Sequence, residues 1–295
     1  ETKTPVPGSI SSFTIDSVNG KIAFINKQSS AGANPVYVVV DKSNKFVLTG
    51  NYTEGNAAVL SANNDGSLNP ALQAIKFIDS SVNKARQEKS HIHSVFFSPA
   101  YDYVYLPDLG SDKIRVFKFG PNSGTPLQEM DNLTVRTVPG SGPRHMAFHP
   151  NKKFVYCIEE MSGMVVVYSY NNGKLNPVQR INSNSKTAAE YSSADIHISP
   201  DGLFLYASNR IENTISIFSI KTDGRLKLIG HQATLGDVPR NFTLDPTGNF
   251  LLVANQGTNN IVVFRRDKKT GMLKDTGIQV SVPSPSCLQM RKYGR

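Results

Sequence analysis

The chain has 295 residues, of which 39% are apolar, and its formal net charge is +9. No run of 18 apolar residues occurs, so a membrane-spanning helix is not expected. The basic residues are scattered singly and the aromatic residues lie in strand-like stretches, which argues against nucleic-acid binding. Two explanations remain for the net positive charge: the basic residues only keep the surface solvated, or they attract anionic ligands. Cys157 and Cys287 lack metal-ligand spacing and do not fix the redox compartment.

The first 33 residues contain one recognisable strand pattern, GSISSFTI from Gly8, which leads into a glycine turn before Ile22. This is the pattern of the last strand of a repeated β-unit together with its closing turn. The earlier strands of that unit have no counterpart in the sequence. We therefore interpret residues 1–33 as a partial unit.

Five copies of one sequence pattern follow over residues 34–280. Each has an apolar strand, a turn such as PDG or PNK, an aromatic-rich strand, a polar loop and a third strand, and most close on a Gly-Leu element. No segment has a sustained helical period. The shared turn position recurs at steps of 57, 51, 50 and 46 residues, at Lys42, Pro99, Pro150, Pro200 and Pro246. A period of about 40–50 residues built only of strands is typical of a β-propeller with one four-stranded blade per repeat.

Residues 281–295 begin with SVPSPSCLQM, the pattern of the first strand of a further blade. A propeller normally closes by completing one blade from both ends of the chain, but this closing strand and the partial blade 1–33 do not add up to one. We therefore expect one all-β propeller domain over residues 1–295, lacking about one and a half blades before Glu1. An unusual six-bladed closure made from the two fragments is the alternative.

Alignment of the repeats separates two faces of each first strand. Side chains alternate along a strand, so the apolar face, which includes Ile196 and Phe242, is expected to pack between blades. The other face and the position where the strand begins carry polar residues that we expect at one mouth of the axial channel: His93, Arg144, His145, Asp195, His197, Arg240 and Asn241. A rim of solvated charges is the alternative interpretation.

Two columns of aligned residues follow the second strands. The first contains only side chains that can tie a turn, which indicates a structural role: Asn51, Asp108, Glu159, Asn209 and Asn255. The second shares no residue type, so a common structural role cannot explain it: Tyr52, Leu109, Glu160, Arg210 and Gln256. Glu160 and Arg210 are the strongest functional candidates of this column.

Other chemistries have little support in the sequence. A GxSxG elbow and a Walker-type phosphate loop are absent. His91 and His93 stand two apart on a strand, but no cysteine or carboxylate pair accompanies them as metal ligands. We therefore expect no metal and no cofactor.

The motifs HIHS, DLGSDKI, GPRHMAFHP, ADIHISPDG, YASNR, PRNFTLDPTG, LLVANQ and PSPSCL occur in this order and resemble the seven-bladed lactonase family. That family includes propeller-type 6-phosphogluconolactonases and a carboxy-muconate lactonizing enzyme. The resemblance covers nearly the whole chain, although the family's first blade and most of its second have no counterpart here. It implies a seven-bladed propeller that hydrolyses a sugar lactone without a metal, most specifically 6-phospho-D-glucono-1,5-lactone of the pentose phosphate pathway. It also places the family's site residues at Glu160, Arg210, His93 and Arg144.

Lactone hydrolysis requires a base that activates water, a cation near the carbonyl oxygen and groups that hold the anionic end of the substrate. Glu160 or His197 is the expected base, Arg210 or Arg144 the oxyanion partner, and Arg240 with His145 the anion-binding pair. The expected catalytic residues are thus Glu160, Arg210, His93, Arg144 and His197, and the expected substrate contacts are His145, Asp195, Arg240 and Gln256.

Two further functions compatible with the sequence are a non-catalytic propeller that binds a ligand or protein, and the reverse chemistry, lactonization of a carboxy-muconate. The expected partner is a small anionic sugar lactone, with no nucleic acid and no membrane. The expected compartment is the cytoplasm, or the periplasm or exterior if a signal peptide has been removed.

Overall fold

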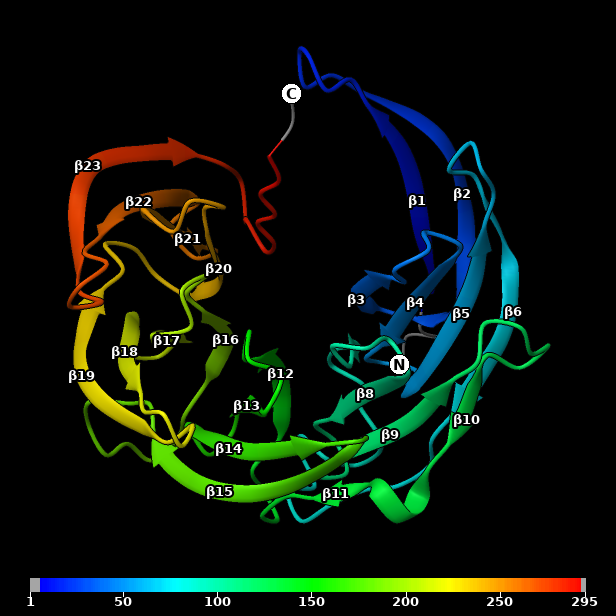
Figure 1. Cartoon of the computed structure of the whole chain (residues 1–295), viewed down its shortest axis with the longest axis horizontal. Coiled ribbons are helices and arrows are strands. Elements are labelled where there is room, and N and C mark those ends of the chain that lie inside the picture. The colour runs from blue at the N-terminus through cyan, green and yellow to red at the C-terminus, as the bar shows by residue number, and fades with distance from the viewer. Residues whose placement is uncertain (1–5, 293–295) are drawn as a thin grey trace. The chain divides into compact units, whose positions relative to one another are not determined.

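The computed structural model describes residues 6–292, and its strands divide between two compact units, residues 6–143 and 144–292. The first unit contains three antiparallel sheets (Figure 1). The strands of its two-stranded sheet are β1 (Pro7–Ile15) and β2 (Ile22–Ala33). The four-stranded sheet runs in the order β3 (Pro35–Val40), β4 (Phe46–Asn51), β5 (Asn56–Ala62) and β6 (Leu68–Lys76). The third sheet contains β7 (Phe96–Phe97), β8 (Tyr103–Asp108), β9 (Lys113–Phe119), β10 (Leu127–Glu129) and β11 (Val135–Arg136), with a short 3₁₀ helix over Asp131–Leu133.

The second unit contains three four-stranded sheets, each with its strands hydrogen-bonded in chain order. The first sheet is formed by β12 (Pro143–Phe148), β13 (Phe154–Glu159), β14 (Met164–Asn171) and β15 (Lys174–Asn182). The second is formed by β16 (Ser193–Ile198), β17 (Phe204–Asn209), β18 (Thr214–Ile220) and β19 (Leu226–Ala233). The third is formed by β20 (Pro239–Leu244), β21 (Phe250–Asn255), β22 (Asn260–Arg266) and β23 (Leu273–Ser281).

The prediction of an all-β chain built from repeated antiparallel sheets is confirmed. Each of the five repeats over residues 34–280 forms one sheet of four or five strands. Residues 6–292 include no helix with the length and apolar character needed to cross a bilayer. The interpretation of residues 1–295 as one domain stays a prediction.

The two ends of the chain differ from the expected fragments. The partial blade 1–33 holds two strands, because β2 pairs back along β1. The closing strand expected over 281–295 is not formed in residues 282–292, since β23 ends at Ser281. In that segment the N–H of Leu288 donates to the side-chain Oδ1 of Asn241 at 2.6 Å, whereas a strand needs a backbone ladder. Residues 1–5 and 293–295 lie outside the described residues.

A polar side chain closes the turn between the first and second strands of a sheet. In the β20–β21 turn, the Asp245 carboxylate accepts the N–H groups of Thr247 at 3.0 Å and Phe250 at 2.7 Å. In the β16–β17 turn, the Ser199 hydroxyl accepts the N–H of Phe204 at 3.0 Å. These bonds give a partner to backbone N–H groups of the turn that the hydrogen bonds between the strands leave unpaired. They also fix the register in which the first strand pairs with the second.

Apolar side chains pack neighbouring sheets of the second unit together. Phe242 from β20 and Tyr206 from β17 are fully buried in one cluster between the second and third sheets. The Tyr206 hydroxyl also donates to the carbonyl oxygen of Gly271 at 2.7 Å, in the β22–β23 turn, and Tyr156 makes the equivalent bond to Gly224 at 2.9 Å. The repeated tyrosine contact holds each sheet against the next and thereby fixes the spacing of their first strands.

The residue before the proline that starts a first strand adopts a left-handed backbone in three sheets. Asn34 (φ 59°), Gly142 (φ 64°) and Val238 (φ 59°) hold this position. Glycine and asparagine accept it at little cost, but a β-branched residue is strained there. Val238 precedes Pro239 and Arg240, so the strain lies next to a predicted substrate contact.

Replacement of Val238 by glycine should relieve this strain. We expect Val238→Gly to raise the free energy of unfolding by about 1 kcal/mol, because the strain of roughly 1–3 kcal/mol exceeds the extra chain entropy of glycine. Thermal unfolding measures the effect. Val138→Gly, at an exposed loop position without a left-handed φ, is the control and should leave stability unchanged or lower it. A lower midpoint for Val238→Gly would show that the position is not strained.

Candidate active site

Polar side chains of the second unit gather where its first strands run. Figure 1 shows β12, β16 and β20 on the inner side of this unit, with β15, β19 and β23 on the outside. Side chains from the three inner strands, and from the residues that follow β13 and β17, build two linked clusters around buried carboxylates. In each sheet of this unit the first strand lies innermost and the fourth strand outermost (Figure 1), which agrees with the predicted blade.

Glu160, directly after β13, is a buried carboxylate held by two arginines. Its Oε2 accepts a hydrogen bond from Nε of Arg144 at 2.9 Å and lies 2.9 Å from Nη2 of Arg210. Arg144 is fully buried and also donates from Nη1 to the carbonyl oxygen of Ala194. Burial lowers the pKa of Arg144 to about 10, opposed by Glu160 and assisted by the positive charges of Arg210 and Arg240. Arg144 therefore remains charged at neutral pH, with Glu160 as its counter-ion.

Asp195, on β16, is the carboxylate of the second cluster. Its Oδ1 accepts from Nδ1 of His145 at 2.7 Å and from the N–H of Ile196 at 3.0 Å. Its Oδ2 accepts from Nε2 of His197 at 2.9 Å and from Nδ2 of Asn241 at 2.5 Å. Burial alone would raise the pKa of Asp195, but the attraction of His197 and the hydrogen bonds from both histidines hold it well below its usual range. Asp195 is therefore ionised at neutral pH.

His145, on β12, links the two clusters as a neutral ring. Burial, and then the positive charge of Arg144, lower the pKa of His145 to about 4 despite its bond to Asp195. A carboxylate accepts and a guanidinium donates, so the single ring proton lies on Nδ1, facing Asp195. The lone pair of Nε2 then faces Nη1 of Arg144 at 3.3 Å. Both ring nitrogens are thus engaged within the protein.

His197, two residues after Asp195 on β16, has a different environment from His145. Its side chain is 36% exposed, and its ring forms a T-shaped pair with Phe242 at a centroid distance of 4.8 Å. Burial lowers the pKa of His197, but the charge and hydrogen bond of Asp195 outweigh burial, so this pKa lies above its ordinary value. Within residues 6–292, the ring's hydrogen bonds to protein involve Nε2 alone. Asp195 therefore orients a basic, partly exposed imidazole whose Nδ1 is available.

The structure places the other predicted site residues as follows. Arg240 is half-buried on β20, and its charge acts on Arg144. Gln256 lies after β21 and donates from Nε2 to Oγ of Ser284 at 3.3 Å. His93 belongs to the first unit, where its ring meets that of Tyr52 edge-on at 5.4 Å, so its place beside the other site residues stays a prediction. The roles assigned to all nine residues also stay predictions.

Asn241, on β20, is a member of the Asp195 cluster to which sequence reasoning gave no catalytic or binding role. Its position was identified on the polar face of the first strand, which is the signal that could have selected it. Asn241, Asp195 and His145 stand at equivalent positions of three successive repeats, five residues before the shared turn proline. The three positions meet at one carboxylate, as the alternation along the strands predicts.

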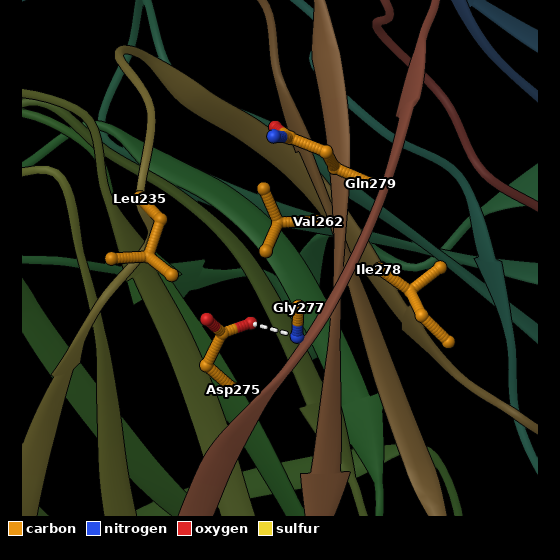
Figure 2. Close-up of a pocket in the computed structure, with 6 residues that line it drawn as sticks. All are labelled: Leu235, Val262, Asp275, Gly277, Ile278 and Gln279. Carbon is orange, nitrogen blue, oxygen red and sulfur yellow. Dashed lines mark hydrogen bonds between the residues drawn. The ribbon is translucent and has the colours of Figure 1, made fainter.

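A shallow pocket on the outer strands of the third sheet is a weaker candidate (Figure 2). Its lining residues are Leu235, Val262, Asp275, Gly277, Ile278 and Gln279. The one ionisable side chain, Asp275, accepts the N–H of Gly277 at 2.9 Å. The pocket therefore offers no acid–base pair. Within residues 6–292, no group of three or more His, Cys, Asp or Glu side chains has an arrangement that could hold a metal ion.

Comparisons with known proteins agree on one family. Residues 1–290 match a family model described as Lactonase, 7-bladed β-propeller. The chain is 46% identical over 298 residues to a 6-phosphogluconolactonase of Formosa agariphila, with 99% of the chain and 84% of that protein covered. It is 35% identical to a 6-phosphogluconolactonase of Bacillus subtilis, with 96% and 80% covered. The crystal structure of a periplasmic gluconolactonase of Pseudomonas aeruginosa superposes with a TM-score of 0.92 at 33% identity, covering 97% of this chain and 81% of that one.

The neutral state of buried His145 predicts a pH dependence of stability. The folded-state pKa of about 4 lies below the unfolded value of about 6.5, so the unfolded chain binds one more proton between these values. Stability that is fully present above pH 6.5 is therefore lost as the pH falls toward 4, by about 1.4 kcal/mol per pH unit. His145→Gln, which can still donate to Asp195, should flatten this slope by about one proton in denaturant unfolding measured from pH 4 to 7. An unchanged slope would contradict a neutral His145.

Proposed function

The chain belongs to the Lactonase, 7-bladed β-propeller family, and we propose from this premise that it hydrolyses a sugar lactone. The first candidate substrate is 6-phospho-D-glucono-1,5-lactone, because relatives that are up to 46% identical are 6-phosphogluconolactonases. The observation that carries the proposal is the Asp195–His197 pair, in which a buried carboxylate orients an imidazole with a raised pKa and is linked through His145 to Arg144. Ester hydrolysis at neutral pH needs a base of this kind.

His197 is the general base in this mechanism. Nδ1 removes a proton from a water molecule as the water oxygen attacks the lactone carbonyl carbon, while Nε2–H remains donated to Asp195. The tetrahedral intermediate then collapses, the bond to the ring oxygen breaks, and that oxygen takes the proton from the imidazolium. The product is an open-chain hydroxy acid, and His197 returns to its neutral form. Asp195 stabilises the transient imidazolium without taking its proton.

The arginines supply the positive charge that the reaction requires. Arg210 is 13% exposed at its side chain, and its Nε–H donates to the carbonyl oxygen of Ser192 at 3.2 Å while Nη2 faces Glu160. A guanidinium held in this way can stabilise the oxyanion that forms on the carbonyl oxygen. Arg240, half-buried at the start of β20, is assigned to the anionic end of the substrate.

Glu160 is assigned a positioning role in preference to the role of base. Its Oε2 already accepts from Arg144 and faces Arg210, so that oxygen has little capacity left for a water proton. Removal of the Glu160 charge would leave Arg144 buried without its counter-ion. This arrangement suits a residue that holds two arginines in place.

The remaining alternatives differ in what they predict for assays. A non-catalytic scaffold would bind ligands without turnover, and a lactonizing enzyme would consume a carboxy-muconate. We place the enzyme in the cytoplasm, with the periplasm as the alternative because one structural relative is a periplasmic gluconolactonase.

Loss of the base should lower turnover far more than binding. We expect His197→Asn to reduce kcat for freshly prepared 6-phosphogluconolactone by about 10²–10⁴-fold with a small change in KM. His231→Asn is the control, because its ring is part-buried on β19 and contacts the carbonyl oxygen of Ser183 at 3.2 Å. It should retain kcat.

Two outcomes would contradict this proposal at different levels. A folded His197→Asn protein that hydrolyses the lactone at the unmodified rate would show that His197 is not the base. An unmodified protein that opens neither the phosphorylated lactone nor glucono-1,5-lactone above the spontaneous rate would overturn the assigned activity and favour a scaffold.

A further inference from the structure

The segment that follows β23 is fastened to the third sheet at several points. The N–H of Val282 donates to the carbonyl oxygen of Asn259 at 3.0 Å, and the N–H of Ser284 donates to Oδ1 of the same residue at 2.7 Å. Gln256 adds its bond to the Ser284 hydroxyl, and Pro285 is buried. Residues 282–288 thus have a defined path even though they form no strand.

Asn241 connects this segment to the catalytic carboxylate. Its Nδ2 donates to Oδ2 of Asp195 at 2.5 Å, and its Oδ1 accepts the N–H of Leu288 at 2.6 Å. The side chain is buried. The orientation of the amide is fixed by its partners, because a carboxylate only accepts and a backbone N–H only donates. One amide therefore joins the segment to Asp195, with each of its polar atoms used once.

The same oxygen of Asp195 also receives the ring of His197, so Asn241 and His197 share one acceptor. Phe242, the next residue on β20, packs against that ring in a T-shaped arrangement with centroids 4.8 Å apart, and its N–H donates to Oδ2 of Asp195 at 3.3 Å. Movement of β20 or of the amide would therefore shift the oxygen and the ring together. Asn241 is placed to set the direction in which Nδ1 of His197 points.

We propose that Asn241 is a positioning residue that couples the 284–288 segment to the Asp195–His197 pair, so that this segment forms one wall of the substrate site. The catalytic part of this inference rests on the proposed lactone hydrolysis. The coupling itself consists of the two hydrogen bonds of Asn241, so it can be tested by an experiment that does not measure catalysis.

Cys287 provides a reporter inside the segment. It is exposed, whereas Cys157, the other cysteine of the chain, is fully buried. Partial burial of the thiol raises the pKa of Cys287 and the negative charge of Asp195 adds to this, against a hydrogen bond with Gln289 that lowers it. A thiol reagent therefore reports on the 284–288 segment without any engineered label.

Two substitutions separate the two ends of the Asn241 amide. Asn241→Leu removes both hydrogen bonds at similar volume. Asn241→Asp keeps an acceptor for the N–H of Leu288 but removes the donor to Asp195 and adds a negative charge beside it. Asn249→Leu is the matched control, since this half-buried residue lies in the turn of the same β20–β21 hairpin, where its Nδ2 donates to Oγ1 of Thr247 at 2.7 Å.

The first measurement is the rate at which methanethiosulfonate modifies Cys287 in the full chain. We expect Asn241→Leu to accelerate modification several-fold, with Asn241→Asp and Asn249→Leu near the unmodified rate. Saturating 6-phosphogluconate, the product of the proposed reaction, should slow modification of the unmodified chain. This last comparison needs no variant, so it holds if Asn241→Leu fails to fold.

The second measurement is the pH profile of kcat/KM. The titratable groups around the pair are Asp195 on β16, which contacts His197 directly, and beyond it His145 and Arg144 on β12, with the thiol of Cys287 interacting with Asp195 from the 284–288 segment. An added carboxylate at position 241 favours the imidazolium, so Asn241→Asp should shift the acid limb of the profile to higher pH and Asn249→Leu should leave it in place.

The proposal is overturned if Asn241→Leu, or Asn241→Asp where the leucine variant does not fold, leaves both the labelling rate and the pH profile unchanged. It is also overturned if the product gives no protection of Cys287. A protein without lactonase activity would instead refute the proposed function, and the labelling rates would still decide whether Asn241 holds the segment.

Discussion

The buried carboxylate of Asp195 is the group on which the arrangement of this site depends. Its negative charge lies away from water, and it is maintained by hydrogen bonds from two histidines, one amide and the backbone. The two histidines respond in opposite ways, because His145 is buried beside Arg144 and His197 is partly exposed. One ring is held neutral as a structural link, and the other becomes the basic group. A positioned and accessible base of this kind can take a proton from water.

Repetition of the sheets makes such a cluster possible. Turn-closing side chains and the tyrosine contacts between sheets recur from one repeat to the next, so the first strands come together in a fixed spacing. The polar face of each first strand then presents one residue at the same level, and three repeats supply three different groups: His145, Asp195 and Asn241. The scaffold is constant, and the chemistry arises from the positions at which the repeats differ. The second buried carboxylate, Glu160, follows the same principle in the column after the second strand.

Much of the fold could be predicted from the sequence, because repeats, turn residues and period-2 alternation are local patterns. The same patterns selected Glu160, Arg210 and the polar face that carries Asp195. They could not assign roles, since roles depend on contacts between sheets some 50 residues apart in the chain. His145 was expected to bind substrate, yet both of its ring nitrogens are engaged within the protein. Asn241 received no role because its bond to Leu288 joins β20 to a segment that was expected to be a strand.

The most direct test of the central claim is a ¹⁵N NMR titration of the histidine rings, assigned with the His145→Gln and His197→Asn variants. We expect His145 to stay neutral with its proton on Nδ1 down to about pH 5, while His197 titrates above its ordinary value of about 6.5. Asp195→Asn should remove the upward shift of His197. A His145 ring that becomes protonated near pH 6.5, or a His197 ring that titrates below that value, would contradict the claim that Asp195 divides the two histidines into a neutral link and a base.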